Sequence, residues 1–268
     1  MSVTIVTCYY IKKSKFNNNQ YLIWIKNLLN NVNNFNLVIY VDKNSFEYIN
    51  NIVNNNPKIK IIIKEMNEFY TYKYKDFWIK NHEKNILLKD KITWEINMLY
   101  SEKINFIKDA CENKYFENNI YIWCDIGYFR CGKYNLPYQY ISTWPNPNKI
   151  KTLNSSKIYY GQVCNNNYLN QIKNQILDKN KNNLPKIPIN PGQVSIAGGF
   201  FIIHKNNIQW WWNTYYNKLK LYFDNNYLVK DDQMIIIDSI SNNFSKFELI
   251  KQQNNNFDRW FAFDTFLL

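Results

Sequence analysis

The sequence predicts an α/β fold, a single domain with a mixed, mostly parallel central sheet flanked by helices. Short apolar runs of strand length alternate with stretches whose apolar residues recur at helical spacing. The chain has 268 residues, of which 46% are hydrophobic and 20% charged, so it can bury a full core. Apolar periodicity resumes promptly after each Asn-rich segment, which favours surface turns over a linker and one domain over residues 1–268.

The apolar patterns in the first half of the chain predict a regular alternation of strands and helices. Apolar runs indicate strands at residues 3–7, 37–41, 59–63 and 120–124. Helical spacing of apolar residues indicates helices at residues 21–29 and 46–53 and one long helix over 93–111.

The second half begins with looser patterning. Six of the seven prolines lie between residues 130 and 191, which predicts long connections with a strand near 158–163 among them. Regular patterns then return, with a strand at 195–204 and helices at 208–223 and 231–240.

The formal charge of +12 comes almost entirely from lysine, since only Arg130 and Arg259 are arginine. Abundant Asn, Ile and Tyr with scarce Ala indicate an AT-rich genome, such as that of a giant virus, a protist parasite or a low-GC bacterium. Proteins that read bases or clamp phosphates rely on the planar fork of arginine. A specific nucleic-acid binder is therefore disfavoured, and a lysine-rich nucleic-acid or polyanion-binding module remains an alternative.

Three features of the sequence bear on cellular location. No apolar run approaches the roughly 18 residues that a membrane span needs. Residues 1–10 lack a basic start, so we expect a first strand there and no signal peptide. Five cysteines without a CxxC pair favour a reducing compartment, hence the cytoplasm, or the host cytoplasm if the source is a virus.

Five of the six glycines gather at two places. Gly127 and Gly132 follow the predicted strand at 120–124, and Gly192, Gly198 and Gly199 lie at or near the strand at 195–204. Glycine lets the backbone or a ligand approach closely, or permits positive φ. The clusters are therefore either a site at strand ends or turns with buried packing.

Two acidic positions are candidates for chemistry. Asp125 directly follows an apolar strand, at the sheet edge where open α/β folds bind ligands and where a carboxylate can hold a hard cation. Asp231, Asp232 and Gln233 open a predicted helix and could aim a carboxylate into a cleft. Both have ordinary alternatives, because carboxylates are also common in turns and at helix starts.

Several familiar motifs are missing. There is no GxGxxG, no P-loop and no GxSxG elbow, so Rossmann dehydrogenases, P-loop kinases and α/β-hydrolases lose their main support. His82 and His204 form no metal-ligand pair. The Trp210–Trp212 run is expected to serve the core.

Taken in order, these clusters resemble glycosyltransferases of the GT-A fold, most closely the HtrL/YibB-like family. The resemblance covers residues 3–237 and rests on the following matching segments: residues 3–9 (VTIVTCY), Ser101-Glu102-Lys103, 123–127 (WCDIG), 197–201 (AGGFF) and Asp231-Asp232-Gln233. It implies a Rossmann-like fold, a nucleotide-sugar donor bound by residues 1–130, and a glycan or glycoconjugate acceptor held by residues 131–268. The implied function is transfer of a sugar to an acceptor hydroxyl.

The resemblance also implies roles for individual residues. Asp125 falls where such enzymes place the metal-binding DxD motif, which implies Mn²⁺ or Mg²⁺. Asp232, Asp231 and Gln233 would face the reaction centre, a carboxylate acting as base if the reaction inverts and Gln233 fitting better if it retains. The nucleotide, diphosphate or donor sugar would be contacted by Thr7, Tyr9, Asp42, Lys103, Gly198 and Gly199.

The sequence departs from the family pattern in two respects. Gly127 replaces the second acidic residue of DxD, and no histidine follows Asp232. Metal binding therefore lacks one of its usual carboxylates. A non-catalytic GT-A-like domain that binds a sugar or a partner is the remaining alternative.

Overall fold

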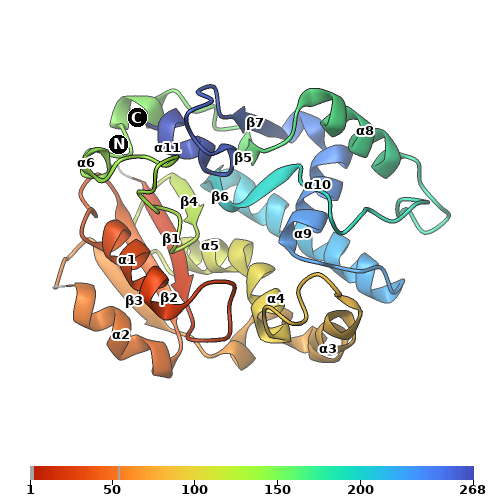
Figure 1. Cartoon of the computed structure of the whole chain (residues 1–268), viewed down its shortest axis with the longest axis horizontal. Coiled ribbons are helices and arrows are strands. Elements are labelled where there is room, and N and C mark those ends of the chain that lie inside the picture. Colours follow the sequence, from red (N-terminus) through yellow and green to blue (C-terminus); the bar gives the residue numbers. More distant parts are fainter. Residues whose placement is uncertain (1–2, 54) are drawn as a thin grey trace.

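One seven-stranded sheet, in the order β3-β2-β1-β4-β6-β5-β7, organises the computed structural model, which describes residues 3–53 and 55–268 (Figure 1). Only β6 runs antiparallel to its neighbours β4 and β5, while the other pairs are parallel. The predicted fold class is therefore confirmed. The strands are β1 (Thr4–Tyr9), β2 (Asn36–Val41), β3 (Ile59–Ile63), β4 (Ile120–Cys124), β5 (Ile158–Gln162), β6 (Ile196–His204) and β7 (Phe247–Lys251).

Helices cover both faces of this sheet. The α-helices of the described residues are α1 (Asn18–Leu29), α2 (Lys43–Val53), α3 (Lys75–Lys84), α4 (Trp94–Tyr100), α5 (Lys103–Glu112), α6 (Tyr138–Ile141), α7 (Pro147–Lys151), α8 (Asn166–Leu177), α9 (Lys205–Asp224), α10 (Asp232–Asn242) and α11 (Ala262–Phe266). Short 3₁₀ helices are η1 (Met66–Glu68), η2 (Tyr70–Tyr74), η3 (Phe244–Lys246) and η4 (Arg259–Phe261).

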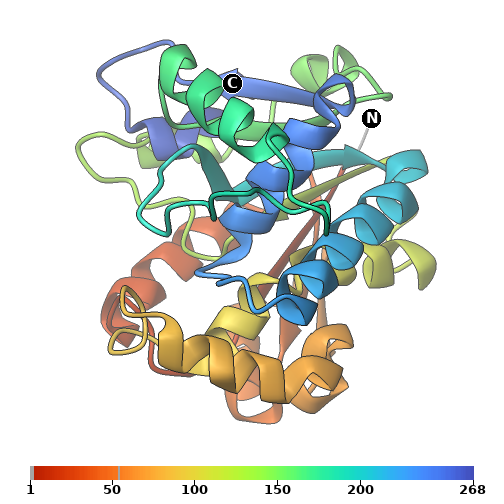
Figure 2. The same cartoon turned by 90° about the vertical axis from the view of Figure 1, so that its right-hand side faces the viewer.

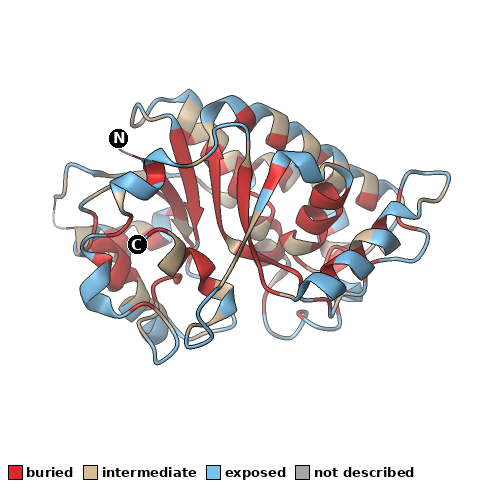
Figure 3. Ribbon diagram, turned by 90° about the horizontal axis from the view of Figure 1, so that it is seen from above, coloured by how far each residue is buried: buried red, intermediate tan, exposed pale blue. Residues whose placement is uncertain are grey.

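The sheet separates two hydrophobic clusters, because successive strand residues point to opposite faces. In β4, Tyr121 and Trp123 belong to the cluster under α5, α9 and α10, whereas Ile120, Ile122 and Cys124 belong to the cluster under α1, α6 and α11. Figure 3 shows the buried strands running between the helical layers. Burial on both faces explains why β4 is an uninterrupted apolar run in the sequence.

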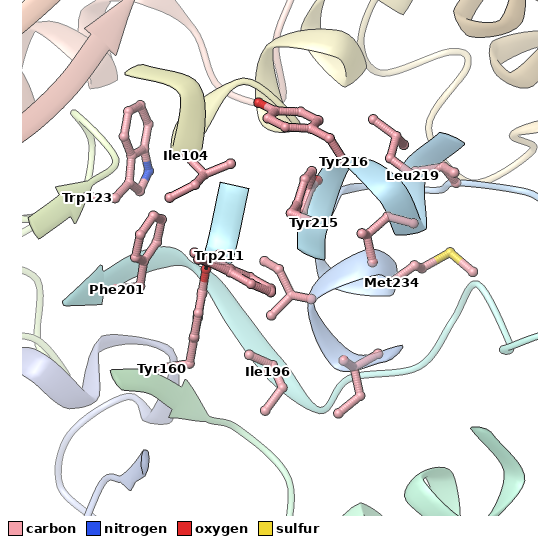
Figure 4. Packing of buried hydrophobic residues seen from close by; sticks show 14 of the residues in the cluster. Ile104, Trp123, Tyr160, Ile196, Phe201, Trp211, Tyr215, Tyr216, Leu219 and Met234 are labelled. Carbon is pink, nitrogen blue, oxygen red and sulfur yellow. Dashed lines mark hydrogen bonds between the residues drawn. The ribbon is translucent and has the colours of Figure 1, made fainter. Parts of the chain in front are cut away.

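The larger cluster is rich in aromatic rings. The fully buried Trp211 of α9 packs against β5, and its Nε1 donates a hydrogen bond to Tyr160 Oη at 3.0 Å (Figure 4). Helices α9 and α10 lie side by side on this face (Figure 2). The expectation that tryptophans of this helix serve the core is confirmed for Trp211, while Trp210 and Trp212 pack half-buried at its margin.

The single helix expected over residues 93–111 is wrong, because it is two helices, α4 and α5, separated at Ser101 and Glu102. The carbonyl of Ser101 accepts a hydrogen bond from Tyr216 Oη at 2.9 Å. The buried carboxylate of Glu102 accepts one from the backbone N–H of Tyr70 at 2.6 Å. These tertiary partners hold the two residues at the break between the helices, and α5 begins at Lys103.

The loose stretch at 130–191 contains more regular structure than its prolines suggest, including α8 and the short α6 and α7. Strand β7 and helices α3 and α11 were not expected either. Elsewhere the expected strands and helices form, and β3 and β4 have the predicted bounds. No helix in the described parts of the chain is long and apolar enough to cross a bilayer.

Candidate functional site

A pocket opens at the carboxyl ends of β1 and β4. The connections from these two neighbouring strands leave in opposite directions, which creates a crevice where α/β sheets bind ligands. The pocket is called the aromatic pocket here, because its rings are Tyr9, Tyr10, Tyr21, Trp24, Tyr100 and Trp123. Its charged lining side chains are Lys12, Lys103, Asp125 and Arg130.

A second pocket, the outer pocket, adjoins it. Asp125, Gly127 and Arg130 line both pockets, so the two meet over the end of β4. The outer pocket is completed by residues that include Gly199, Gln233, Asp258, Trp260 and Phe261. A ligand in one pocket would therefore meet a ligand in the other beside Asp125.

Lys103 joins the two acidic positions that the sequence singled out. From the first turn of α5 its Nζ lies 3.2 Å from Asp125 Oδ1 and 2.9 Å from Asp232 Oδ2, and it donates a hydrogen bond to the carbonyl of Gly198 at 2.8 Å. Burial alone would lower the pKa of Lys103, but Asp125 and Asp232 outweigh it and hold the pKa above its usual value. The ammonium therefore stays charged.

Asp125 is the accessible member of this cluster, with 43% of its side chain exposed. Its Oδ1 accepts a hydrogen bond from Trp123 Nε1 at 2.7 Å, and its backbone N–H donates to the carbonyl of Gly199 at 2.8 Å. Strand β6 thus fixes the Asp125 backbone, while Trp123 and Lys103 fix its carboxylate. Asp125 lines the aromatic pocket at the carboxyl edge of the sheet.

Asp232 is buried at the start of α10. Burial raises the pKa of its carboxyl from 3.8 to about 6, with Lys103 opposing the rise and Asp231 adding to it. Asp231 is equally buried, and its Oδ2 forms an ion pair with Lys230 Nζ at 3.0 Å. Neither carboxylate lines the two pockets, whereas the next residue, Gln233, lines the outer one.

The glycine pair in β6 makes room for the two carboxylates. A Cβ on Gly198 would lie 2.7 Å from Asp232 Oδ2, and a Cβ on Gly199 would lie 3.2 Å from Asp125 Oδ2. Neither glycine has positive φ, so the space and not the backbone angle calls for glycine here. The pair was expected to admit a donor sugar, and its contacts are with Asp232 and Asp125.

The remaining expected contact residues separate into two groups. Tyr9 lines the aromatic pocket beside Lys103. Thr7 is fully buried within β1 and Asp42 caps α2, its Oδ1 accepting from the N–H of Ser45 at 2.8 Å. Thr7 and Asp42 do not line the aromatic pocket, and the carboxylate of Asp42 serves as a helix cap.

Sequence reasoning missed Arg130 as a site residue. Its guanidinium lies over the rings of Phe16, Trp24 and Phe261, with centroid distances of 4.8, 4.6 and 5.0 Å. It thereby ties the loop before α1 to the C-terminal segment at the junction of the two pockets. The sequence feature that could have indicated Arg130 is the rarity of arginine in this lysine-rich chain.

The residues present do not fit the metal ion that the resemblance implies. Within residues 3–53 and 55–268, no group of three His, Cys, Asp or Glu side chains could hold a cation. Asp125 and Asp232 have a charged ammonium between them. The site thus offers two carboxylates already paired with a cation. Use of Mn²⁺ or Mg²⁺ stays a prediction that this donor set disfavours.

The fold and site define an α/β protein with a two-part cleft at the carboxyl edge of its sheet. No protein-family model and no curated protein matches the chain. Solved structures that resemble it include a galactosyltransferase, LgtC, in complex with donor and acceptor sugar analogues. The alignment covers 93% of this chain and 73% of that chain, with 9% identity and a TM-score of 0.49. At this level the similarity assigns no activity.

Proposed function

We propose that this chain is a glycosyltransferase that moves a sugar from a nucleotide-sugar to an acceptor hydroxyl. The observation that carries the proposal is Asp125, a fixed and accessible carboxylate where an aromatic pocket and an outer pocket meet. An inverting transfer needs this arrangement, since two substrates must react beside a group that accepts a proton. The GT-A and HtrL/YibB-like resemblance of the sequence supports the same function.

The donor belongs in the aromatic pocket. A nucleobase can stack on its tyrosine and tryptophan rings, as bases do on aromatic side chains generally. Lys12, Lys103 and Arg130 set three positive charges against the single carboxylate of Asp125 on the pocket wall. This excess of positive charge favours a diphosphate and stabilises it as negative charge develops on leaving. Residues 1–130 supply the whole lining, in agreement with a donor-binding first half.

The acceptor belongs in the outer pocket. Trp260 and Phe261 offer apolar ring surface, while Gln233 and Asp258 offer polar atoms for hydroxyl groups. Half of the twelve residues that line the outer pocket, these four among them, come from the second half of the chain, where an acceptor-binding part is expected. A glycan or glycoconjugate hydroxyl held here would enter the space beside Asp125.

The reaction then follows from these positions. The acceptor oxygen bonds to the anomeric carbon, the bond from that carbon to the diphosphate oxygen breaks, and the diphosphate leaves with the electron pair. Asp125 takes the acceptor proton, which is the base role of an inverting reaction. Asp232 and Asp231, first expected as catalytic groups, lie beneath the pockets, and we assign Asp232 a positioning role through Lys103. Gln233 lines the outer pocket, where a retaining reaction would use it.

A thermal-shift screen tests the donor assignment, since a ligand that binds the native state raises its melting temperature. Nucleotide-sugars are expected to raise the melting temperature of the wild type, and a Trp24→Ala variant is expected to lose the shift. Trp210→Ala removes a half-buried tryptophan away from both pockets and should keep it. A panel of nucleotide-sugars that leaves the wild type unchanged would contradict the assignment. A shift by single-stranded oligonucleotides alone would favour the polyanion-binding alternative.

A further inference from the structure

The position between Asp125 and Asp232 is where a divalent cation would be sought in this site, and Lys103 already fills it. Its Nζ lies 3.2 Å from one carboxylate and 2.9 Å from the other, with a hydrogen bond to the carbonyl of Gly198. Only 9% of the Lys103 side chain is exposed. A cation entering here would have to displace a buried charge that three oxygen atoms hold.

Gly127 gives a second reason why a metal ion does not fit this site. A Cβ at this position would lie 2.8 Å from Cε3 of Trp24, so the indole ring fills the space that a second acidic side chain would need. Trp24 itself packs against Arg130 and Phe16. The missing carboxylate is therefore part of a packed aromatic arrangement and not an isolated substitution.

We propose that the Lys103 ammonium takes the place of a divalent cation in this site, so that a nucleoside diphosphate and its sugar bind without metal. Lys103 holds the two carboxylates together, and Lys12 and Arg130 supply further positive charge facing the diphosphate. Asp125, free of a metal ion, keeps its role as proton acceptor. The inference rests on the proposed function for the identity of its ligand.

The first test is a titration of Mn²⁺ alone into the purified full chain, followed by the electron paramagnetic resonance signal of the free ion. The wild type is expected to leave this signal unchanged. Loss of the signal in the wild type, with recovery in Asp125→Asn, would overturn the inference. This measurement needs no nucleotide, so its outcome does not depend on the proposed function.

The second test is calorimetry with uridine and guanosine diphosphates in EDTA and in Mn²⁺. The dissociation constant is expected to agree within about twofold between the two conditions, and a gain of about tenfold or more with Mn²⁺ would overturn the inference. Binding of neither nucleotide in either condition would count against the proposed function, and the Mn²⁺ titration would still decide the metal question.

Lys103→Met removes the charge at similar length and is expected to weaken binding of the tighter-binding diphosphate about tenfold or more in EDTA. Lys218→Met is the matched control, because Lys218 also pairs with a buried carboxylate, Asp238 at 2.9 Å, away from both pockets. Equal diphosphate affinity in Lys103→Met and the wild type would overturn the role of Lys103. If Lys103→Met does not fold, the wild-type titrations with Mn²⁺ and with the diphosphates still test the inference.

Discussion

Gly198 leaves open the space that the Asp232 carboxylate fills, since a Cβ on Gly198 would lie 2.7 Å from Asp232 Oδ2. The same glycine accepts a hydrogen bond from Lys103 through its carbonyl. One residue of β6 thus sets the position of both members of the buried ion pair. Small structural changes in β6 are therefore expected to alter the candidate site by displacing Lys103 and Asp232.

Gly198→Ala should lower turnover by about 10²-fold, because the methyl group must push Asp232, and with it Lys103, out of position. The measurement is kcat with a nucleotide-sugar donor. Gly192→Ala is the control, since its Cβ would meet only Asn190 Oδ1 at 3.2 Å, outside both pockets. If Gly198→Ala keeps normal turnover, the close approach of Gly198 and Asp232 has no functional role.

Asp232→Asn should change how stability depends on pH. The folded pKa of Asp232, about 6, lies above its ordinary value of 3.8, so the folded state binds more protons between these pH values. Its contribution to stability is therefore full below pH 4 and is lost as the pH rises through 6. Asn stays neutral, so the melting temperature of the variant relative to wild type should rise from pH 4.5 to pH 7.5.

The comparison needs melting curves of both proteins in one buffer series. Asp178→Asn serves as a control, because Asp178 is an exposed carboxylate paired with Lys186 and should add little pH dependence. A constant difference between Asp232→Asn and wild type across the series would show that Asp232 does not titrate in this window.

Glu102→Gln should destabilise the fold by on the order of 1–3 kcal/mol. The buried carboxylate accepts hydrogen bonds at one oxygen from Tyr70 N and Asn105 Nδ2 and at the other from Thr71 N and Oγ1. An amide turns an N–H₂ group toward two of these donors. Urea unfolding measures the loss.

Glu112→Gln is the matched control for Glu102→Gln, because Glu112 lies on the same helix in an exposed i,i+4 pair with Lys108. Its effect should stay below about 0.5 kcal/mol. Equal unfolding midpoints for the two variants would contradict the anchoring role of Glu102.

Local features of the sequence predicted much of the fold and part of the site. The apolar run of β4 followed by Asp125 indicated a buried strand with a carboxylate at its end, and both are present. Strand β7 was missed because it is a half-exposed edge strand whose short sequence carries no clear alternation. The break before Lys103 depends on partners far along the chain, such as Tyr216, which no local pattern reveals.

The pairing of Lys103 with Asp232 could not be predicted for the same reason. Each residue begins a helix, and their contact arises only because α5 and α10 both pack against the same face of the sheet. The site's chemistry therefore depends on long-range packing, whereas Lys103, Asp125 and Asp232 were each singled out in the sequence.

The most direct test of the proposed function is release of nucleoside diphosphate from a nucleotide-sugar, with and without acceptor, by wild type and Asp125→Asn in EDTA. The wild type should release diphosphate, and Asp125→Asn should fall by about 10²–10⁴-fold while donor affinity is retained, as expected for loss of a general base. Equal rates in the two proteins would contradict the role of Asp125. No release by the wild type from any donor that it binds, in EDTA or with Mn²⁺, would contradict the claim that this chain is a glycosyltransferase, whereas release only with Mn²⁺ would contradict the metal-free inference.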